Sequence, residues 1–332
     1  MTVNWDPLKK LVQQEQRFLL TSHVRPDCDA LGSELAMAGV LRACNKDVVI
    51  VNDHPTPPNL AFIDPKREIT PLDTYQAGAP QPPDVVMVLD TSAWVQLGRM
   101  AEYIRAFKGK VAVVDHHVGE DDLDAVLLKD TSAEATGRLV IEAAQALGVP
   151  LTTDIASPAF AALATDTGWF RFASVRGDTY RLAGKMVDAG ADPAAIYAQL
   201  YERDTVGRVR LRGVILSRVA VELEGKLVHT YVETADFERT GAVYSDTEDV
   251  VNMTLAIEGT EVAVIFVEQP TGEVKVSFRS RSLFNCSEMA SRFGGGGHKA
   301  AAGAMVEGPL EAARERVLEA VREEMARLAG TR

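Results

Sequence analysis

The chain has 332 residues, of which 46% are hydrophobic and 25% charged, and this ordinary globular usage excludes a disordered or fibrous protein. At about 150 residues per domain, the length predicts two domains. The 47 acidic residues outnumber the 35 basic ones, which gives a net charge of −12. Such a chain repels polyanions at long range, so the composition argues against a long nucleic-acid duplex as a partner and leaves a short phosphorylated ligand open.

Neither the apolar runs nor the cysteines point to a membrane or a secreted protein. No apolar run approaches the roughly 18 residues that cross a bilayer, and the N-terminus lacks the apolar core of a signal peptide. The three cysteines, Cys28, Cys44 and Cys286, are far apart and form neither a disulfide framework nor a zinc-binding pair. We therefore expect a cytoplasmic protein without a membrane partner.

Short β-branched runs alternate with helix-like segments in the first half of the chain. The expected strands cover residues 18–24, 48–51, 85–89 and 111–114, and the expected helices between them cover residues 30–43 and 101–107. This alternation predicts a parallel sheet with helices on both faces. Ligands of such sheets bind beyond the carboxyl ends of the strands.

Three further helices are expected in the middle of the chain. Thr131 and Glu134 have the spacing of a capping box, which predicts a helix that runs to Leu147. A second helix is expected from about Asp154 to Leu163. Residues 205–223 mix apolar and arginine positions in the pattern of an amphipathic helix.

The remaining sequence has the texture of a second, smaller domain. Strands are expected near residues 227–232, 262–267 and 274–278, and helices near Met289 and over residues 310–328. We therefore predict an α/β protein with an N-terminal parallel-sheet domain and a smaller mixed α/β C-terminal domain. The expected boundaries are 1–190 for the first domain, 191–222 for a connector that contains a helix, and 223–332 for the second domain.

Residue types that bind metal ions follow three of the four strands expected in the first domain. They are His23, Asp27 and Asp29 after the first strand, Asp90 after the third, Asp115, His116 and His117 after the fourth, and Asp166 after a later helix. Singly, each has an ordinary explanation, since an aspartate at a strand end is most often a turn former or a helix cap. Their coincidence at equivalent positions of a parallel sheet favours one shared site.

Hydrolysis by two metal ions is the chemistry that suits this set. Carboxylates packed closely together repel one another and take up protons unless divalent cations neutralise them. Two ions roughly 3.5–4 Å apart, bridged by one carboxylate, hold a hydroxide for in-line attack on phosphorus. Oxygen-rich ligation with a few imidazoles favours manganese or magnesium over zinc.

A glycine run near the C-terminus is a second candidate site. Gly294 to Gly297 precede His298, and backbone N–H groups of consecutive glycines can approach an anion closely. The alternative is a flexible linker. Upstream, Arg279 is expected either to bind a phosphate or to be a solvated charge at the rim, and Arg281 is expected to be a rim charge.

Together these residues resemble the DHH phosphoesterase family, in the two-domain branch with a DHH-associated C-terminal domain that includes the bacterial nanoRNases. The matching motifs are His23-x-x-x-Asp27-x-Asp29 with Gly32-Ser33, then Asp90, Asp115-His116-His117, Asp166 and Gly294–His298. They occur in the family's order over nearly the whole chain. One departure is Cys28, which stands where the family usually has glycine. This departure bears on sensitivity to oxidation rather than on activity.

The resemblance implies two Mn²⁺ ions, with Mg²⁺ as the other candidate, and a role for each residue. His23 and Asp27 would hold one ion, Asp29, His116 and Asp166 would hold the other, and Asp90 would bridge them. His117 would act with Asp90 in catalysis and face the substrate phosphate, while Asp115 would orient the adjacent imidazole. Arg279, Ser280, Gly295, Gly296, Gly297 and His298 would bind the substrate.

By the same resemblance, the chain would be a manganese-dependent phosphodiesterase and phosphatase that acts on short oligoribonucleotides (nanoRNA) and on 3′-phosphoadenosine 5′-phosphate. The alternatives are a phosphodiesterase of cyclic dinucleotides or linear pApA and, less favoured because no ligand is missing, a non-catalytic nucleotide-binding protein. The Gly294–His298 loop argues against a family II pyrophosphatase, and the chain length argues against a RecJ-like exonuclease. The oligomeric state is left open, a homodimer included.

Overall fold

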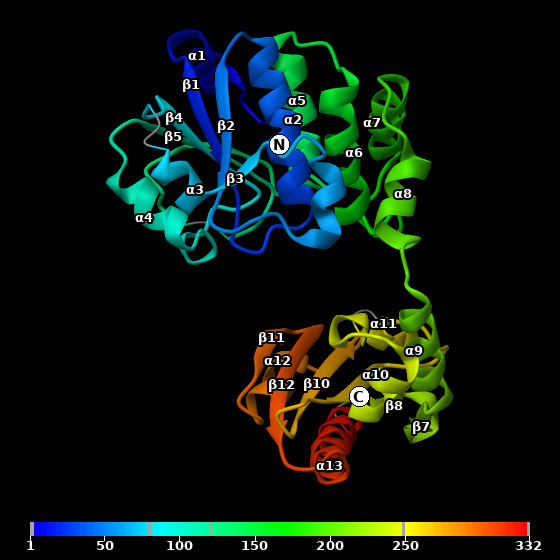
Figure 1. Cartoon of the computed structure of the whole chain (residues 1–332). Helices are drawn as coiled ribbons and strands as arrows, with labels where there is room; N and C mark the ends of the chain where they lie inside the picture. Colours follow the sequence, from blue (N-terminus) through cyan, green and yellow to red (C-terminus); the bar gives the residue numbers. More distant parts are fainter. Residues whose placement is uncertain (1–2, 79–80, 120, 248–249, 331–332) are drawn as a thin grey trace. The chain divides into compact units, whose positions relative to one another are not determined.

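The computed structural model describes every residue except 1–2, 79–80, 120, 248–249 and 331–332 (Figure 1). The chain divides into two compact units, Met1–Arg203 and Asp204–Arg332, each built around its own six-stranded sheet. The predicted class, an α/β protein with a parallel sheet in the first part and a mixed sheet in the second, is confirmed.

The first sheet is parallel throughout, in the order β3-β2-β1-β4-β5-β6. Its strands are β1 (Arg17–Thr21), β2 (Asp47–Asn52), β3 (Ile69–Pro71), β4 (Val85–Leu89), β5 (Lys110–Asp115) and β6 (Val126–Lys129). The winding reverses between the neighbours β1 and β4, and a reversal of this kind opens a crevice at the carboxyl ends of the strands. The sequence analysis missed β3 and β6, because edge strands of 3 and 4 residues carry little pattern.

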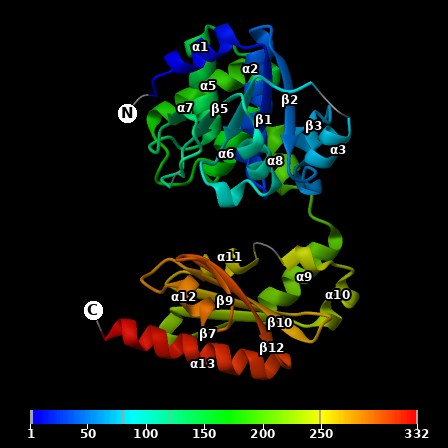
Figure 2. The same cartoon turned by 90° about the vertical axis from the view of Figure 1, so that its left-hand side faces the viewer.

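Helices cover both faces of this sheet (Figures 1 and 2). One face packs against α1 (Asp6–Gln14), α2 (Cys28–Ala43), α5 (Thr136–Leu147) and α6 (Thr153–Asp166), with α7 (Gly177–Asp188) and α8 (Pro193–Tyr201) beside α6. The other face packs against α3 (Leu72–Ala77) and α4 (Arg99–Ala106). Side chains of a strand alternate between the two cores, as Phe18 and Leu20 face one and Leu19 the other.

Two local predictions for this unit are wrong. The first strand ends at Thr21 rather than at Val24, so His23 lies in the loop that follows. Helix α5 has Ala135 as its N-cap, without a side-chain cap, so the capping box with Glu134 does not form. The Glu134 carboxylate is buried and instead accepts hydrogen bonds from Arg138, at 2.9 Å, and from Thr179.

The second sheet is mixed, in the order β11-β12-β10-β9-β8-β7, with β8 and β9 parallel and the other pairs antiparallel. Its strands are β7 (Ala220–Glu222), β8 (Leu227–Val232), β9 (Val262–Glu268), β10 (Glu273–Ser280), β11 (Gly296–His298) and β12 (Ala301–Glu307). One face packs against α12 (Cys286–Ser291) and the long α13 (Leu310–Ala329), as Figure 2 shows for α13. The other face packs against α9 (Val206–Ser217), α10 (Thr234–Thr240) and α11 (Val250–Leu255).

The residues expected to form a connector, 191–222, are shared between the two units. Helix α8 belongs to the first unit and α9 to the second, and the division falls between Arg203 and Asp204. Short 3₁₀ helices also lie in loops, at Pro58–Ile63, Trp94–Gln96, Leu223–Gly225 and Tyr244–Thr247. Among the described residues, no helix combines the length and the apolar character that crossing a membrane requires.

Candidate metal centre

The loop from β1 to α2 supplies the first three acidic and imidazole groups of the site. Asp27 is the N-cap of α2, and its Oδ1 accepts hydrogen bonds from the backbone N–H groups of Asp29 at 2.9 Å and Ala30 at 3.1 Å. This cap uses one carboxylate oxygen and leaves Oδ2 for another partner. The capping role and the ligand role that the sequence suggested for Asp27 are therefore compatible.

Asp29 is buried and anchored by the start of a distant helix. Its Oδ2 accepts a hydrogen bond from the backbone N–H of Thr136 at 2.8 Å, and its Oδ1 accepts one from Gly137 at 2.9 Å. Ser33 Oγ donates a third bond to Oδ1, at 3.2 Å. Because the unpaired N–H groups of a helix N-terminus favour an anion, the first turn of α5 holds this carboxylate in place.

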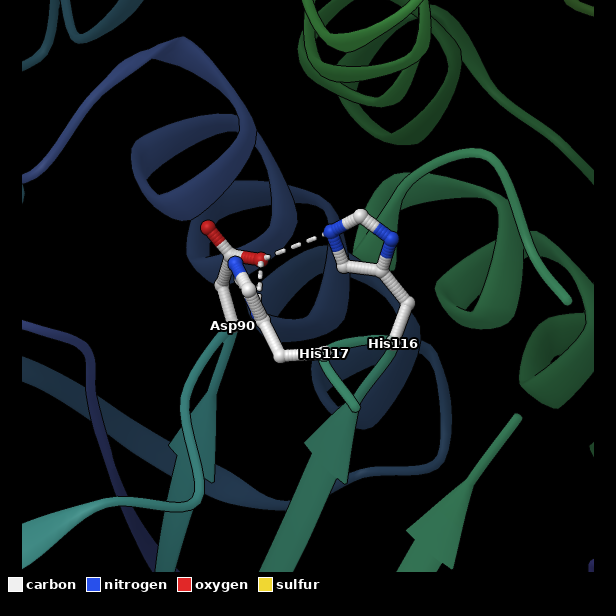
Figure 3. A group of neighbouring side chains, drawn as sticks. All are labelled: Asp90, His116 and His117. Carbon is white, nitrogen blue, oxygen red and sulfur yellow. Dashed lines mark ion pairs between the residues drawn. The ribbon is translucent and has the colours of Figure 1, made fainter. Parts of the chain in front are cut away.

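Asp90, directly after β4, lies between two imidazoles. Its Oδ2 is 3.5 Å from His23 Nε2, and its Oδ1 is 3.6 Å from His116 Nε2 (Figure 3). Thr136 Oγ1 donates a hydrogen bond to Oδ1 at 2.9 Å. The backbone of Asp90 has a φ of 64°, a strained conformation for a residue with a side chain. The two oxygens of this one carboxylate thus face two different groups of side chains.

His116 faces three carboxylates at once. Its Nε2 lies 3.7 Å from Asp29 Oδ2, 3.4 Å from Asp166 Oδ2 and 3.6 Å from Asp90 Oδ1. Its Nδ1 lies 3.2 Å from the carbonyl oxygen of Ala133. Since a carbonyl oxygen only accepts, this contact places a proton on Nδ1 and leaves Nε2 as the ring atom that could coordinate a metal ion.

Asp115, the last residue of β5, holds the neighbouring His117. The carboxylate is fully buried, and its Oδ1 accepts a hydrogen bond from His117 Nδ1 at 2.8 Å. Its Oδ2 accepts a bond from Ser92 Oγ at 2.7 Å and lies 3.2 Å from Lys129 Nζ. Burial favours the neutral acid, yet the bonds from His117 and Ser92 bring the pKa of Asp115 down to about 2. The bond to Asp115 in turn raises the pKa of the half-exposed His117.

Three further carboxylates, those of Asp29, Asp90 and Asp166, resist ionisation on their own. Burial raises the pKa of Asp29, and burial together with the nearby Asp29 charge raises the pKa of Asp90 well above its usual range. The same two causes raise the pKa of Asp166 to about 6. Burial lowers the pKa of His23, which keeps that imidazole neutral and able to coordinate. A set of this kind fits divalent cations, whose charge would offset the repulsion.

The potential ligand atoms fall into overlapping groups. His23, Asp27 and Asp90 form one group and Asp29, His116 and Asp166 a second, and within each the atoms lie within 4.8 Å of one another. Asp90, His116 and His117 form a third (Figure 3). The structure thus brings together all six side chains expected to be ligands, and that they bind metal stays a prediction.

Sequence reasoning missed several side chains around these ligands. Thr136 bonds to both Asp29 and Asp90, while Ser92 and Lys129 bond to Asp115 or lie beside it. The signal for Lys129 was present, because an apolar run over 126–128 ends in this cation as the other strands end in ligands. Cys28 is buried among apolar side chains, and burial raises the pKa of its thiol to about 12, which makes it unreactive.

In the second unit, the expected substrate-binding residues divide between the two faces of the sheet. Arg279 on β10 and His298 on β11 both pair with Ala301 of β12, so their side chains leave the same face. Arg279 Nε donates a hydrogen bond to Asn252 Oδ1 at 3.2 Å. Ser280 points to the opposite face, is buried, and accepts a hydrogen bond from Ser282 N at 3.1 Å.

The glycine run is part of a hairpin. Gly296 and Gly297 lie on β11, which pairs with the following strand β12. A Cβ on Gly295 would lie 2.1 Å from the carbonyl oxygen of Gly303, and one on Gly297 would lie 2.7 Å from that of Ala301. The glycines therefore permit a close backbone approach, while Gly296, Gly297 and His298 remain exposed.

Comparisons with known proteins agree with this arrangement. The N-terminal domain of the DHH family matches residues 17–163, and the DHHA1 domain matches residues 224–327. The chain is 34% identical over 311 residues to the bifunctional oligoribonuclease and PAP phosphatase NrnA of Thermus thermophilus, which covers 93% of this chain and 90% of the relative. It is 28% identical over 291 residues to the protein of the same name from Bacillus subtilis, with 87% and 88% covered.

A solved structure shares the whole architecture. The crystal structure of an exopolyphosphatase-related protein from Bacteroides fragilis superposes with a TM-score of 0.86 at 26% identity, and the match covers 96% of this chain and 95% of the other. The two domains, the order of the motifs and the relatives all agree. The chain therefore belongs to the DHH family, in the branch with a DHHA1 domain, and is a hydrolase of that family.

Proposed function

We propose that the chain is a metal-dependent phosphodiesterase and phosphatase that hydrolyses short oligoribonucleotides and 3′-phosphoadenosine 5′-phosphate. The observation that carries the proposal is the position of Asp90, whose two oxygens face His23 and His116, one from each group of potential ligands. The names of the two NrnA relatives, which match over about nine-tenths of their own length, support the substrate class.

Two Mn²⁺ ions, or Mg²⁺ ions in their place, are the cofactors that we propose. His23 and Asp27 would hold one ion, Asp29, His116 and Asp166 the other, and Asp90 both. When bound, such ions act as Lewis acids and lower the pKa of an attacking water. The donors are carboxylate oxygens and neutral imidazoles without a thiolate, which suits manganese or magnesium better than zinc.

His117 would act on the substrate as an acid. Nδ1 is engaged by Asp115, and this bond raises the pKa of His117, which favours the imidazolium form with a proton on Nε2. That proton can first form a hydrogen bond to a phosphate oxygen and can then be transferred to the departing alkoxide. Asp115 acts as a positioning residue for His117. Its own orientation is fixed by four contacts, one each with Ser92 and Lys129 and two with the side chain and backbone of His117.

We propose a division of labour between the domains, with 1–190 for catalysis, 191–222 as the connector and 223–332 for substrate binding. In the last of these, Arg279, Ser280, Gly295, Gly296, Gly297 and His298 would bind phosphates or a terminal nucleotide. Arg279 and His298 share a face of the sheet, which supports a joint role, whereas Ser280 would contribute only through its backbone. Free thiols at Cys28, Cys44 and Cys286 are in keeping with our further proposal of a cytoplasmic enzyme.

The test is turnover of a substrate panel with one metal at a time. The panel contains an RNA trinucleotide, 3′-phosphoadenosine 5′-phosphate, linear pApA and cyclic di-AMP, each with Mn²⁺, Mg²⁺, Zn²⁺ or a chelator. We expect hydrolysis of the first two with Mn²⁺ or Mg²⁺ and none with chelator. Preference for cyclic di-AMP or pApA would favour the alternative phosphodiesterase, and binding without turnover would favour a nucleotide-binding protein.

Asp90→Asn is the decisive variant. The amide keeps the shape and tolerates the positive φ, but it cannot bind two cations, so we expect activity to fall by at least about 100-fold. Without metal, the same variant is expected to melt at a higher temperature than the wild type, because a desolvated carboxylate has been removed. An Asp90→Asn or Asp90→Ala enzyme with full manganese-dependent activity on a dinucleotide would rule out the proposed mechanism.

A further inference from the structure

An aromatic ring lies against the turn that leaves the metal centre. Asp166 ends α6, and Gly168, two residues later, has a φ of 57°. A Cβ on Gly168 would lie 2.4 Å from a ring carbon of Phe172, so the ring packs directly on the glycine. Phe172 is nevertheless 54% exposed, six residues along the chain from Asp166.

The turn itself is held from behind by other aromatic side chains. Trp169 and Phe170 both have positive φ values, 59° and 62°, and pack on Phe160 from α6 with ring centroids 6.1 and 5.9 Å away. Tyr180 stacks on Phe170 at 5.5 Å and is itself 58% exposed. This packing fixes the turn, so Phe172 is presented on a supported backbone rather than on a loose loop.

The charge around Phe172 is opposite to that of the chain as a whole. Residues 171–185 contain four basic residues and one acidic residue, in a chain with a net charge of −12. The basic residues are Arg171, Arg176, Arg181 and Lys185, and all four are exposed. The one acid in this range, Asp178, is paired with Arg138 at 2.7 Å and with Arg176 at 3.5 Å, and the exposed Asp188 ends α7 three residues later. A polyanion that the rest of the chain repels is therefore attracted locally to this surface.

We infer that Phe172 is a stacking platform for one base of an oligoribonucleotide whose scissile phosphate lies at the metal centre, and that α7 attracts the phosphates beyond it. Every nucleobase has an aromatic face, so a ring beside cationic side chains binds single-stranded RNA without selecting its sequence. The short path from Asp166 to Phe172 suits a base next to the reacting phosphate. This inference rests on the proposed function and deepens it by naming the side chain that recognises an RNA substrate.

The experiment is a cycle between protein and substrate. The substrates are the trinucleotide AAA and analogues in which one base at a time is replaced by an abasic ribose, and the proteins are wild type and Phe172→Ala. Stacking contributes about 1–3 kcal/mol per base, so we expect KM for AAA to rise about 5- to 150-fold in Phe172→Ala. For one abasic analogue, the KM of the wild type should be raised by the same factor relative to AAA. The variant should not raise the KM for that analogue further, since both changes remove the same contact.

Further variants separate stacking from support of the turn. Phe172→Tyr should restore the KM of the wild type, while Phe172→Leu, which keeps an apolar side chain on Gly168, should not. Val49→Ala removes an exposed apolar side chain from β2 and should leave KM unchanged. Mn²⁺ affinity and melting temperature should be those of the wild type in Phe172→Leu, which serves as the test variant if Phe172→Ala does not fold.

The outcomes distinguish this inference from the function on which it rests. A wild-type enzyme that does not hydrolyse AAA would overturn both. If the wild type hydrolyses AAA, two results would overturn only the stacking role of Phe172. One is an equal loss on every analogue in Phe172→Ala, and the other is full activity of Phe172→Leu.

Lys185→Gln should reduce the salt dependence of KM for AAA. Lys108→Gln, which changes an exposed lysine after α4, should not. Equal effects of the two would overturn the role of α7.

Discussion

Lys129 Nζ lies 3.2 Å from Asp115 Oδ2, and both side chains are almost completely buried. The amine also donates hydrogen bonds to Ser92 Oγ at 2.7 Å and to the carbonyl oxygen of Gly119 at 2.8 Å. This cation therefore compensates the charge of the carboxylate that holds His117. The edge strand β6, which presents Lys129, is connected in this way to the site.

Lys129→Met should destabilise the protein strongly. Removing one partner of a buried ion pair leaves an uncompensated charge, and the usual loss is about 3–5 kcal/mol of unfolding free energy. The control is Lys110→Met on the neighbouring strand, where Nζ lies 2.7 Å from Glu15 in an exposed pair, and the expected loss there is below about 1 kcal/mol. Urea unfolding measures both, and equal losses would contradict the role assigned to Lys129.

Gly137→Ala should disturb the anchor of Asp29. A Cβ at this position would lie 2.6 Å from Ala162 Cβ and 3.1 Å from the carbonyl oxygen of Ala159, so α5 must move away from α6. We expect a loss of about 1–3 kcal/mol in stability, together with weaker Mn²⁺ binding measured by calorimetry. Gly184→Ala on α7 meets open space and should instead stabilise its helix by up to about 1 kcal/mol. Unchanged Mn²⁺ affinity in Gly137→Ala would show that the α5 backbone does not hold Asp29.

The pH dependence of stability should report on Glu34. This side chain is fully buried in α2, accepts a hydrogen bond from Asn52 Nδ2 at 2.9 Å, and has its pKa raised by burial to about 8. Because the folded state holds this proton more tightly than the unfolded state, stability is present at low pH and is lost as the pH rises from about 4.5 through 8.

Glu34→Gln isolates that contribution. The amide stays neutral, so the variant should match the wild type at about pH 5 and exceed its stability at about pH 9. Urea unfolding in the presence of a chelator measures the difference without interference from bound metal. Glu102→Gln, at an exposed position on α4, should give the same difference at both pH values. A Glu34→Gln difference that does not change with pH would mean that Glu34 is ionised in the folded protein.

Arg279→Ala should weaken substrate binding and leave the metal centre intact. A charge-assisted hydrogen bond to phosphate is worth about 1.5–3 kcal/mol, which corresponds to a rise of about 10- to 100-fold in KM for 3′-phosphoadenosine 5′-phosphate. Arg281→Ala is the matched control, because this arginine lies two residues further on and is exposed. Steady-state kinetics test the pair, and a larger effect at Arg281 would reverse the two assignments.

The sequence predicted which side chains gather at the candidate metal centre, because their position follows from topology. Parallel strands bring their carboxyl ends to one edge, so residues after β1, β4 and β5 had to meet once the strands were recognised. Asp166 was found by its place after a helix and by the family resemblance. The short edge strands β3 and β6 were missed, since three or four residues do not establish a pattern.

The supporting contacts could not be predicted for a different physical reason. Thr136 reaches the site through the packing of α5, which is a long-range contact without a local signal, and Lys129 reaches it through the pairing of β6, an edge strand too short to be predicted. Glu134 and Thr131 had the spacing of a cap, but burial of Glu134 beside Arg138 outweighed that local preference. The sequence pattern therefore located the side chains of the candidate site, and local spacing misjudged the start of one helix that holds them.

The left-handed backbone conformation at Asp90 limits which residues can replace it during evolution. Glycine, asparagine and aspartate tolerate such a φ far better than branched or bulky residues, and of these three only aspartate bears a charge. A lineage released from selection for hydrolysis would therefore drift here toward asparagine or glycine, which suit this backbone but lack the charge that the proposed role of Asp90 requires. The residue at position 90 would then distinguish working descendants of this chain from those that have become nucleotide receptors.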